Sequence, residues 1–176
     1  MEHSCVSVKT IGTQDCPREQ AWDTLAFYEH ITMKPSLFLR MALPIPVRSE
    51  GKYGKIGDVS QCEYSDGGCL VKKITRLVET ESIEFDVTGQ SIRFHSVIRL
   101  LNAGVALRDK ANGETEVILL TRYSCLLGPQ TVIQFFVRFV ISAVHKIVLQ
   151  DMRRHLSSGS ISPRPIASMT NNTSCD

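Results

Sequence analysis

The apolar positions of this chain follow three successive patterns, and the first covers its N-terminal forty residues. Residues 5–11 alternate between apolar and polar side chains, which predicts a strand that ends at Gly12. Pro17 followed by Glu19 is typical of the first turn of a helix, and apolar residues recur at helical spacing behind that pair. A second short helical stretch is expected over residues 36–40.

After Pro46 the apolar positions recur at every second residue. This pattern predicts strands that are separated by short turns rich in Gly, Asn and Asp: 58–64, 70–77, 82–87, 92–101, 105–108 and 116–124. One of the predicted turns is Asn102-Ala103-Gly104. Short connections between consecutive strands require antiparallel pairing, because a parallel neighbour needs a long crossover. The region therefore predicts an antiparallel meander.

The third pattern is a long helix, expected over residues 129–157 with Gly159 placed to end it. At 100° per residue, its second half has one apolar stripe, and His145 lies near the middle of that stripe. In its first half, apolar residues cover most of the circumference. We therefore expect this half to be held by the sheet or by a partner.

Composition and charge exclude several classes of protein. The chain has 176 residues, of which 43% are hydrophobic and 22% charged, as in a soluble globular domain. We expect one domain at 3–157 and a disordered tail rich in Ser, Pro and Asn at 158–176. The formal net charge is +2 and the basic residues are scattered, which argues against nucleic-acid binding.

The remaining composition points to a cytoplasmic protein without a cofactor. The most apolar window, 131–149, contains Arg138, His145 and Lys146, so stable membrane insertion is not expected. The N-terminus lacks the features of a secretory signal, and the six cysteines form no CxxC pair, which favours free thiols in the cytoplasm. No motif of a zinc hydrolase, phosphate loop or nucleophile elbow occurs, so we expect no metal and no cofactor.

Several short motifs occur in an order that is typical of one superfamily: Cys16-Pro17-Arg18-Glu19-Gln20-Ala21-Trp22, Gly57-Asp58-Val59-Ser60-Gln61-Cys62-Glu63-Tyr64, Gly67-Gly68, Lys72-Lys73-Ile74-Thr75, Ile83-Glu84-Phe85-Asp86-Val87, Leu119-Leu120-Thr121-Arg122-Tyr123 and His145. From about residue 5 to 156 the chain resembles the START-like superfamily, also called SRPBCC, which includes polyketide cyclase/dehydrase and lipid-transfer proteins. The resemblance implies an α+β helix-grip fold. In that fold a curved antiparallel sheet wraps around the C-terminal helix, two short helices follow the first strand, and an apolar cavity lies between sheet and helix.

This implied cavity makes the side chains that face it candidates for catalysis or binding. His145 is a candidate general acid or base; the alternative is a core histidine that is satisfied within the protein. Tyr64 and Tyr123 are further catalytic candidates, since a buried hydroxyl can polarise a carbonyl or stabilise an enolate. For Tyr64 the alternative is a hydroxyl in water at the end of its strand. The candidate ligand contacts are Cys62, which shares a strand face with Tyr64, and Arg40, Phe85, Val148 and Met152.

Two functions follow from these candidates, and a third class stays open. The first is binding of a small hydrophobic or polyketide-like ligand in the cavity, with cyclase- or dehydratase-like activity. The alternative is a non-catalytic carrier of a lipid or isoprenoid, for which burial of the apolar tail supplies nearly all the affinity. The third class is an interaction module or homodimer that is joined through the apolar first half of the long helix.

Overall fold

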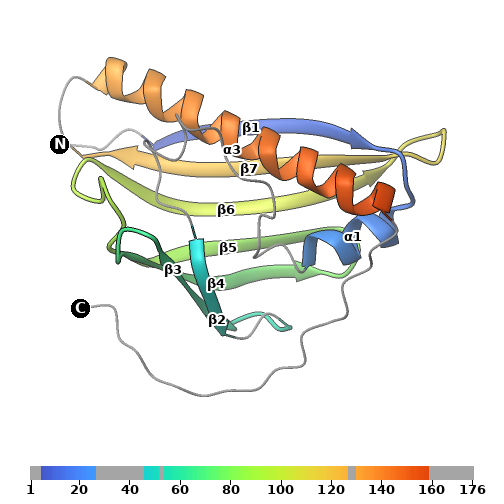
Figure 1. The fold of residues 1–176 in the computed structure, drawn as a ribbon, viewed down its shortest axis with the longest axis horizontal. Coiled ribbons are helices and arrows are strands. Elements are labelled where there is room, and N and C mark those ends of the chain that lie inside the picture. The colour runs from blue at the N-terminus through green and yellow to red at the C-terminus, as the bar shows by residue number, and fades with distance from the viewer. Residues whose placement is uncertain (1–4, 27–45, 52–53, 127–129, 159–176) are drawn as a thin grey trace.

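The structure is a computed structural model that describes residues 5–26, 46–51, 54–126 and 130–158. Seven strands form one antiparallel sheet, and a long C-terminal helix lies across one of its faces (Figure 1). The elements are β1 (Cys5–Gln14), α1 (Arg18–Ala26), β2 (Pro46–Gly51), β3 (Val59–Tyr64), β4 (Cys69–Val78), β5 (Ser82–Gln90), β6 (Ile98–Asp109), β7 (Thr115–Cys125) and α3 (Gln130–Ser158). The strand order is β1-β7-β6-β5-β4-β3-β2, so the predicted α+β helix-grip fold is confirmed.

Strand register defines which side chains share the sheet face that α3 covers, here called the inner face. Directly opposed residues of antiparallel strands point to the same face, so the assignment can be carried from strand to strand. From β1 to β3 the inner face includes Val8, Thr10, Gly12, Val117, Leu119, Thr121, Tyr123, Leu107, Val105, Ile83, Phe85, Ile74, Lys72, Leu70, Ser60, Cys62 and Tyr64.

The hydrophobic core lies where α3 meets one side of this face. One cluster joins α1, β6, β7 and α3, and it contains Cys16, Ala21, Leu107, Val117, Leu119, Leu149 and Met152. A second cluster lies beneath the first half of α3 and contains Val8, Tyr123, Cys125 and Val137. At Gly12 a Cβ atom would come within 2.7 Å of Cδ1 of Leu149. The missing side chain therefore lets α3 pack closely on β1.

Polar bonds also hold α3 and α1 in place. The Gln14 side-chain amide donates to the carbonyl of Leu149 at 3.0 Å, and the Thr115 hydroxyl donates to the carbonyl of Cys16 at 2.7 Å. Both bonds are buried, where an unmade hydrogen bond costs the most. They satisfy groups that lie far apart in the sequence, so the second half of α3 has a defined position on the sheet.

The meander differs from its prediction in two strands. The strand β2 was not predicted, and β6 is one continuous strand in place of two strands joined by a turn at Asn102. A Cβ atom at Gly104 would lie 2.9 Å from the carbonyl oxygen of Ile83. The glycine therefore marks a close approach of the neighbouring strand, so reading it as part of a turn was wrong.

The start of the predicted strand 92–101 is also wrong, since residues 92–97 form turns. Both carboxylate oxygens of Asp66 accept backbone bonds here, from the N–H groups of Arg93 at 2.7 Å and Gly68 at 3.0 Å. Burial alone would raise the pKa of Asp66, but these bonds outweigh it and lower the pKa. The alternation over 92–101 predicts Phe94 on the apolar face of a strand and His95 on the solvent side. This is wrong for Phe94, which has a positive φ and is exposed. It is right for His95, which is exposed.

Some expectations fall outside the described residues or depart from the structure. The helical stretch at 36–40, its residue Arg40 and the tail at 159–176 lie outside the described residues, so the division into one domain and a tail stays a prediction. Cys5, Cys16 and Cys125 are free thiols, as predicted, whereas Cys69 is disulfide-bonded.

Candidate functional site on the inner face of the sheet

His145 projects from α3 onto the inner face, as predicted, and both of its ring nitrogens have protein partners there. Nδ1 lies 2.9 Å from the Thr10 hydroxyl on β1, and Nε2 lies 2.9 Å from the Thr121 hydroxyl on β7. A neutral imidazole has one donor and one acceptor nitrogen, and each hydroxyl can take the complementary role. The two threonines therefore satisfy the ring completely.

Burial also sets the charge of His145. It lowers the pKa of the imidazole from its usual value of 6.5 to about 4. The ring is therefore neutral near pH 7, whereas an acid or base catalyst works best with a pKa near the working pH. The contacts and the pKa together favour a core histidine at this position.

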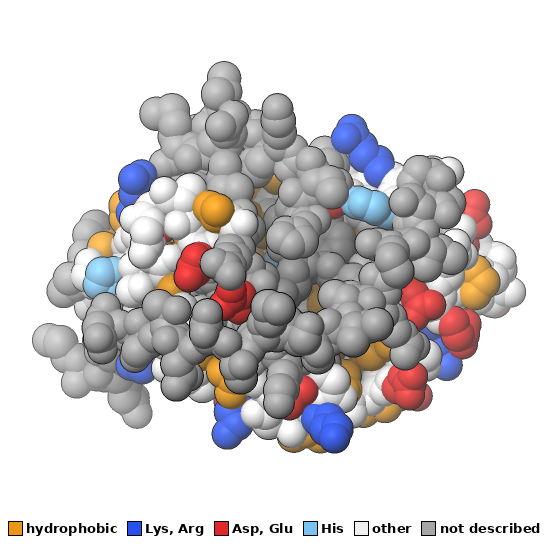
Figure 2. All heavy atoms as spheres, turned by 60° about the horizontal axis from the view of Figure 1, so that its bottom comes forward, with side chains coloured by type: hydrophobic (Ala, Val, Ile, Leu, Met, Phe, Trp, Pro, Cys, Tyr) orange, Lys and Arg blue, Asp and Glu red, His pale blue; other side chains and the backbone are white. Residues whose placement is uncertain are grey.

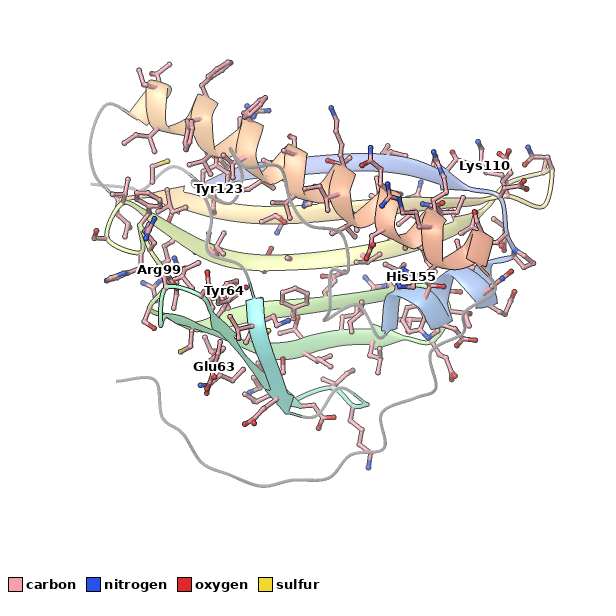
Figure 3. All side chains as sticks on the ribbon, viewed as in Figure 1. Glu63, Tyr64, Arg99, Lys110, Tyr123 and His155 are labelled. Atoms are coloured by element: carbon pink, nitrogen blue, oxygen red, sulfur yellow. The ribbon has the colours of Figure 1, made fainter. Side chains whose placement is uncertain are left out.

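Tyr123 lies beneath the first half of α3, on β7 (Figure 3). Its side chain has no exposed surface, and its hydroxyl donates to the carbonyl of Gln134 at 3.2 Å. Burial raises the pKa of this phenol, and the nearby thiol of Cys125 adds to that effect. In this geometry the hydroxyl holds α3 on the sheet.

Tyr64 and Cys62 lie on the inner face of β3, as the alternation predicts. Cys62 is buried, and Tyr64 is half-buried at the end of its strand. Four strand spacings separate β3 from β7, which is roughly 19 Å along the sheet. The two tyrosines are labelled on different strands in Figure 3. The described structure therefore does not bring Tyr64 together with Tyr123 and His145 in one catalytic group.

The predicted ligand contacts also lie in two separate places, some in the core beneath α3 and some on strands farther along the sheet. Met152 is fully buried, and Val148 packs beside it in the cluster with α1. Phe85 lies instead on β5, half-buried, and the ammonium of Lys72 is 5.2 Å from the centre of its ring. This distance is within the range of a cation–π contact. Phe85, like Cys62 on β3, thus lies away from the core beneath α3.

Lys72 was not predicted as a site residue, although its position in the alternating pattern could have indicated one. In the alternating segment of β4, Lys72 shares a face with Leu70 and Ile74, both of which are buried. A lysine in an apolar row of this kind places a positive charge on the inner face. Its diagonal neighbour across the β3–β4 pair is Cys62, at about 7–8 Å by register.

Packing divides the inner face into two regions. The helix α3 packs against β1, β7 and α1, and we call this part the covered region. No comparable packing joins α3 to β3, β4 or β5 among the described residues, and we call the inner face of these strands the β3–β5 region. Its apolar side chains are Leu70, Ile74, Ile83 and Phe85, and its polar ones are Ser60, Cys62, Tyr64 and Lys72. Within the described ranges, no cluster of three His, Cys, Asp or Glu side chains could hold a metal ion.

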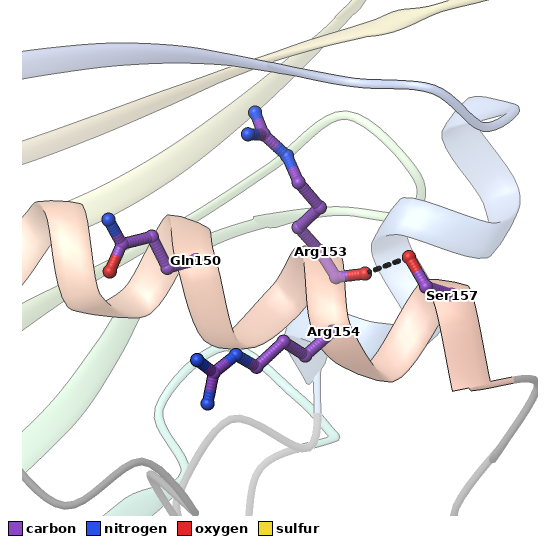
Figure 4. A pocket seen from close by; sticks show the side chains of 4 residues that line it. All are labelled: Gln150, Arg153, Arg154 and Ser157. Atoms are coloured by element: carbon purple, nitrogen blue, oxygen red, sulfur yellow. Dashed lines mark hydrogen bonds between the residues drawn. The ribbon is translucent and has the colours of Figure 1, made fainter.

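A separate pocket lies at the second half of α3 (Figure 4). It is open to solvent, and its described lining consists of Gln150, Arg153, Arg154 and Ser157. The Ser157 hydroxyl donates to the carbonyl of Arg153 at 2.8 Å. No candidate residue from the sequence belongs to this lining, so the pocket is distinct from the inner face.

Comparisons with known proteins agree on the fold. No protein-family model and no curated protein sequence matches this chain. A zhui aromatase/cyclase from Streptomyces sp. R1128 is similar in structure, with a TM-score of 0.59 and 12% identity over 87% of this chain and 96% of that one. An uncharacterised protein from Bacillus thuringiensis has a TM-score of 0.58 and 12% identity over 84% and 98% of the two chains. The chain therefore has an SRPBCC-like, helix-grip fold.

Proposed function

We propose that this protein binds a small hydrophobic molecule on the β3–β5 region of the sheet. The observation that carries the proposal is the packing of α3, which among the described residues lies on β1 and β7 and has no comparable packing with β3, β4 or β5. Ligand sites are typically apolar surfaces with a few polar groups that orient the ligand. The aromatase/cyclase similarity supports a polyketide-like ligand, since that protein shares the architecture.

The positions of the polar groups favour binding over acid–base catalysis. Tyr64 and Lys72 lie on adjacent strands, and register places Lys72 opposite Ser60. Tyr64 is four residues further along β3, which is roughly 13 Å. The two groups could contact opposite ends of an elongated ligand, but they do not converge on one atom. His145 is neutral and fully bonded, so it offers no acid or base to this region.

The expected ligand has an apolar body and an anionic or carbonyl oxygen. Its body would contact the side chains of Ile83, Phe85 and Leu70, and each buried methylene contributes about 0.8 kcal/mol. The Lys72 ammonium, held over the Phe85 ring, would contact the oxygen. A non-catalytic carrier in the cytoplasm needs no further group. Cyclase-like activity is the second candidate, because the half-buried phenol of Tyr64 could stabilise an enolate.

The test uses the naphthalene sulfonate dye ANS, which combines an apolar body with one negative charge. Binding is followed by fluorescence in the wild type, in Lys72→Met, and in the matched control Lys73→Met, whose lysine is exposed on the opposite sheet face. Loss of a charge-assisted bond at Lys72 should weaken binding about tenfold or more, whereas Lys73→Met should bind as the wild type does. Equal affinities in both variants would contradict the proposal.

A second measurement separates carriage from catalysis. Native mass spectrometry of the purified protein gives the mass of any co-purifying ligand. That compound is then incubated with the wild type and with Tyr64→Phe, and products are followed by chromatography. Unchanged ligand in both samples supports a carrier, while turnover that is lost in Tyr64→Phe supports the cyclase-like candidate.

A further inference from the structure

The outer side of the first half of α3 carries a group of exposed apolar side chains. Val132, Phe135, Phe136 and Phe139 are 67%, 77%, 45% and 55% exposed. At 100° per residue these four lie within an arc of about 100°, on the opposite side of the helix from His145. We call them the apolar patch. The sequence predicted that the sheet or a partner holds this half of the helix. The sheet holds its inner side, whereas the outer side carries the exposed apolar patch.

Every exposed charge on α3 is positive. Arg138, Lys146, Arg153 and Arg154 are exposed, and the one carboxylate of the helix, Asp151, is fully buried beside His155. Elsewhere on the described surface, some basic side chains pair with acidic ones, as in Arg76–Glu84 at 3.4 Å and Lys110–Glu114 at 3.3 Å. Acidic and basic side chains also occur together on the face drawn in Figure 2.

The basic residues continue the line of the apolar patch along the helix. Lys146, Arg153 and Arg154 fall within the same range of angles as the patch, two to five turns further on. The outer side of α3 therefore changes from apolar to cationic along its length. Phenylalanines followed by basic residues on one face are typical of helices that lie in the interface of an anionic membrane.

We infer that the outer side of α3 docks on the surface of an anionic phospholipid bilayer. The apolar patch enters the boundary between headgroups and acyl chains, and Lys146 and Arg154 contact lipid phosphates. The guanidinium of Arg153 donates to the carbonyl of Thr13 on β1 at 3.1 Å and adds positive charge beside them. Charge complementarity favours an anionic bilayer as the partner of this side of α3, because clustered Lys and Arg near a surface are attracted to acidic lipids. The inference concerns a different face from the proposed ligand site, and it stands independently of it.

The helix lies on the membrane in this arrangement and does not cross it. Thr131–Ser157 is long and apolar enough to span a bilayer by length and composition. Its inner side, however, is fastened to the sheet by the bonds of Tyr123 to Gln134 and of His145 to two threonines. Crossing the bilayer would break these buried bonds and expose the sheet core, whereas docking through the outer side leaves them intact.

A second copy of this chain fits the outer side less well. If two α3 helices packed antiparallel along their full length, the apolar patch of each would face the basic half of the other. If they packed parallel, the basic residues of one would face those of its partner, and like charges in contact repel. Either arrangement removes charges from water without providing opposite ones.

The inference is tested by co-sedimentation of the full chain with vesicles of phosphatidylcholine alone and with about 30% phosphatidylserine, which gives an anionic surface. The protein should sediment with the anionic vesicles, and about 0.5 M salt should release most of it, since the screening length then falls to a few ångströms. Sedimentation with neither vesicle, or equally with both, would overturn the inference.

Two double variants assign the binding to the outer side of α3. Phe135→Ser with Phe139→Ser removes half of the apolar patch, and Lys146→Gln with Arg154→Gln removes two cations. All four side chains are exposed, so circular dichroism should be unchanged. Each variant should reduce vesicle affinity about tenfold, whereas Lys9→Gln with Lys73→Gln, which removes two exposed cations from the sheet, should reduce it less than twofold.

The same variants test the alternative of a second copy. Sedimentation velocity should show a monomer for the wild type in the absence of vesicles. A dimer that dissociates in the Phe135→Ser, Phe139→Ser variant, with no vesicle binding by the wild type, would overturn the inference in favour of a homodimer. An equal loss of vesicle affinity in the Lys9→Gln, Lys73→Gln control would also overturn it, because binding would then depend on net charge alone.

Discussion

The covered region and the β3–β5 region belong to one face of one sheet, yet among the described residues α3 packs on only the first of them. In the covered region, His145 and Tyr123 each have protein partners, and both are buried beneath α3. In the β3–β5 region, Tyr64 and Phe85 are half-buried, and the charged Lys72 lies on the inner face. The contrast comes from the position of α3, which packs on β1 and β7.

This difference separates groups whose bonds hold α3 on the sheet from groups that lie on strands α3 does not cover. A buried polar group that is fully bonded adds stability and specificity but offers nothing further to a substrate. Residue type alone does not make the distinction, since a tyrosine lies in each region. The hydroxyl of Tyr123 bonds to the carbonyl of Gln134 on α3, whereas Tyr64 lies on β3, which has no comparable packing with α3 among the described residues.

The largest expected effect is loss of folding when a charge enters the covered region. Met152→Asp places a carboxylate where the side chain has no exposed surface, which costs several kcal/mol against a total stability of about 5–15 kcal/mol. Circular dichroism should show an unfolded chain. The matched control is Arg154→Asp, at an exposed position two residues away, which should remain folded. If Met152→Asp folds, position 152 is not tightly buried, and the covered region is then no more densely packed than the β3–β5 region.

The next effect is a dependence of stability on pH that comes from His145. Its pKa is about 4 when folded and about 6.5 when unfolded, so between these values the unfolded chain binds more protons. The stabilisation is complete above pH 6.5 and is lost as the pH falls to about 4, an effect of about 3 kcal/mol. Urea denaturation at pH 7 and at about pH 4.5 should measure most of this loss.

The variant His145→Phe isolates this contribution from those of other groups. Asp66 also loses stabilisation in acid, because its pKa is lowered, but it does so below its usual pKa of 3.8. The variant should therefore have a flatter dependence of stability on pH between 6.5 and 4.5 than the wild type. Equal slopes in the two proteins would mean that the imidazole is exposed to water, and the covered region would then extend less far than described.

The smallest expected effect comes from the phenol beneath α3. Tyr123→Phe removes the donor to the Gln134 carbonyl and should cost about 1 kcal/mol, or roughly 2–4 °C in Tm. Binding of the dye ANS at the β3–β5 region should not change, because the two regions lie on different strands. Weaker dye binding with unchanged stability would assign Tyr123 to the ligand site and would remove the distinction between the regions.

The sequence by itself determined the features that depend on local periodicity. The alternation after Pro46 predicted an antiparallel meander, and the stripe on the last helix correctly placed His145 toward the sheet. The same alternation placed Cys62 and Tyr64 on one strand face. These predictions hold because side-chain direction repeats every two residues in a strand and every 3.6 in a helix, whatever the chain packs against.

Only the tertiary structure decided which groups meet. The partners of His145 are 135 and 24 residues away in the sequence, and no spacing rule identifies Thr10 and Thr121 as those partners. Gly104 was misread as part of a turn because the close approach of β5 arises only when the sheet forms. The exposure of the apolar patch likewise depends on which side of α3 the sheet covers. Contacts between distant segments follow from packing, which local sequence does not encode.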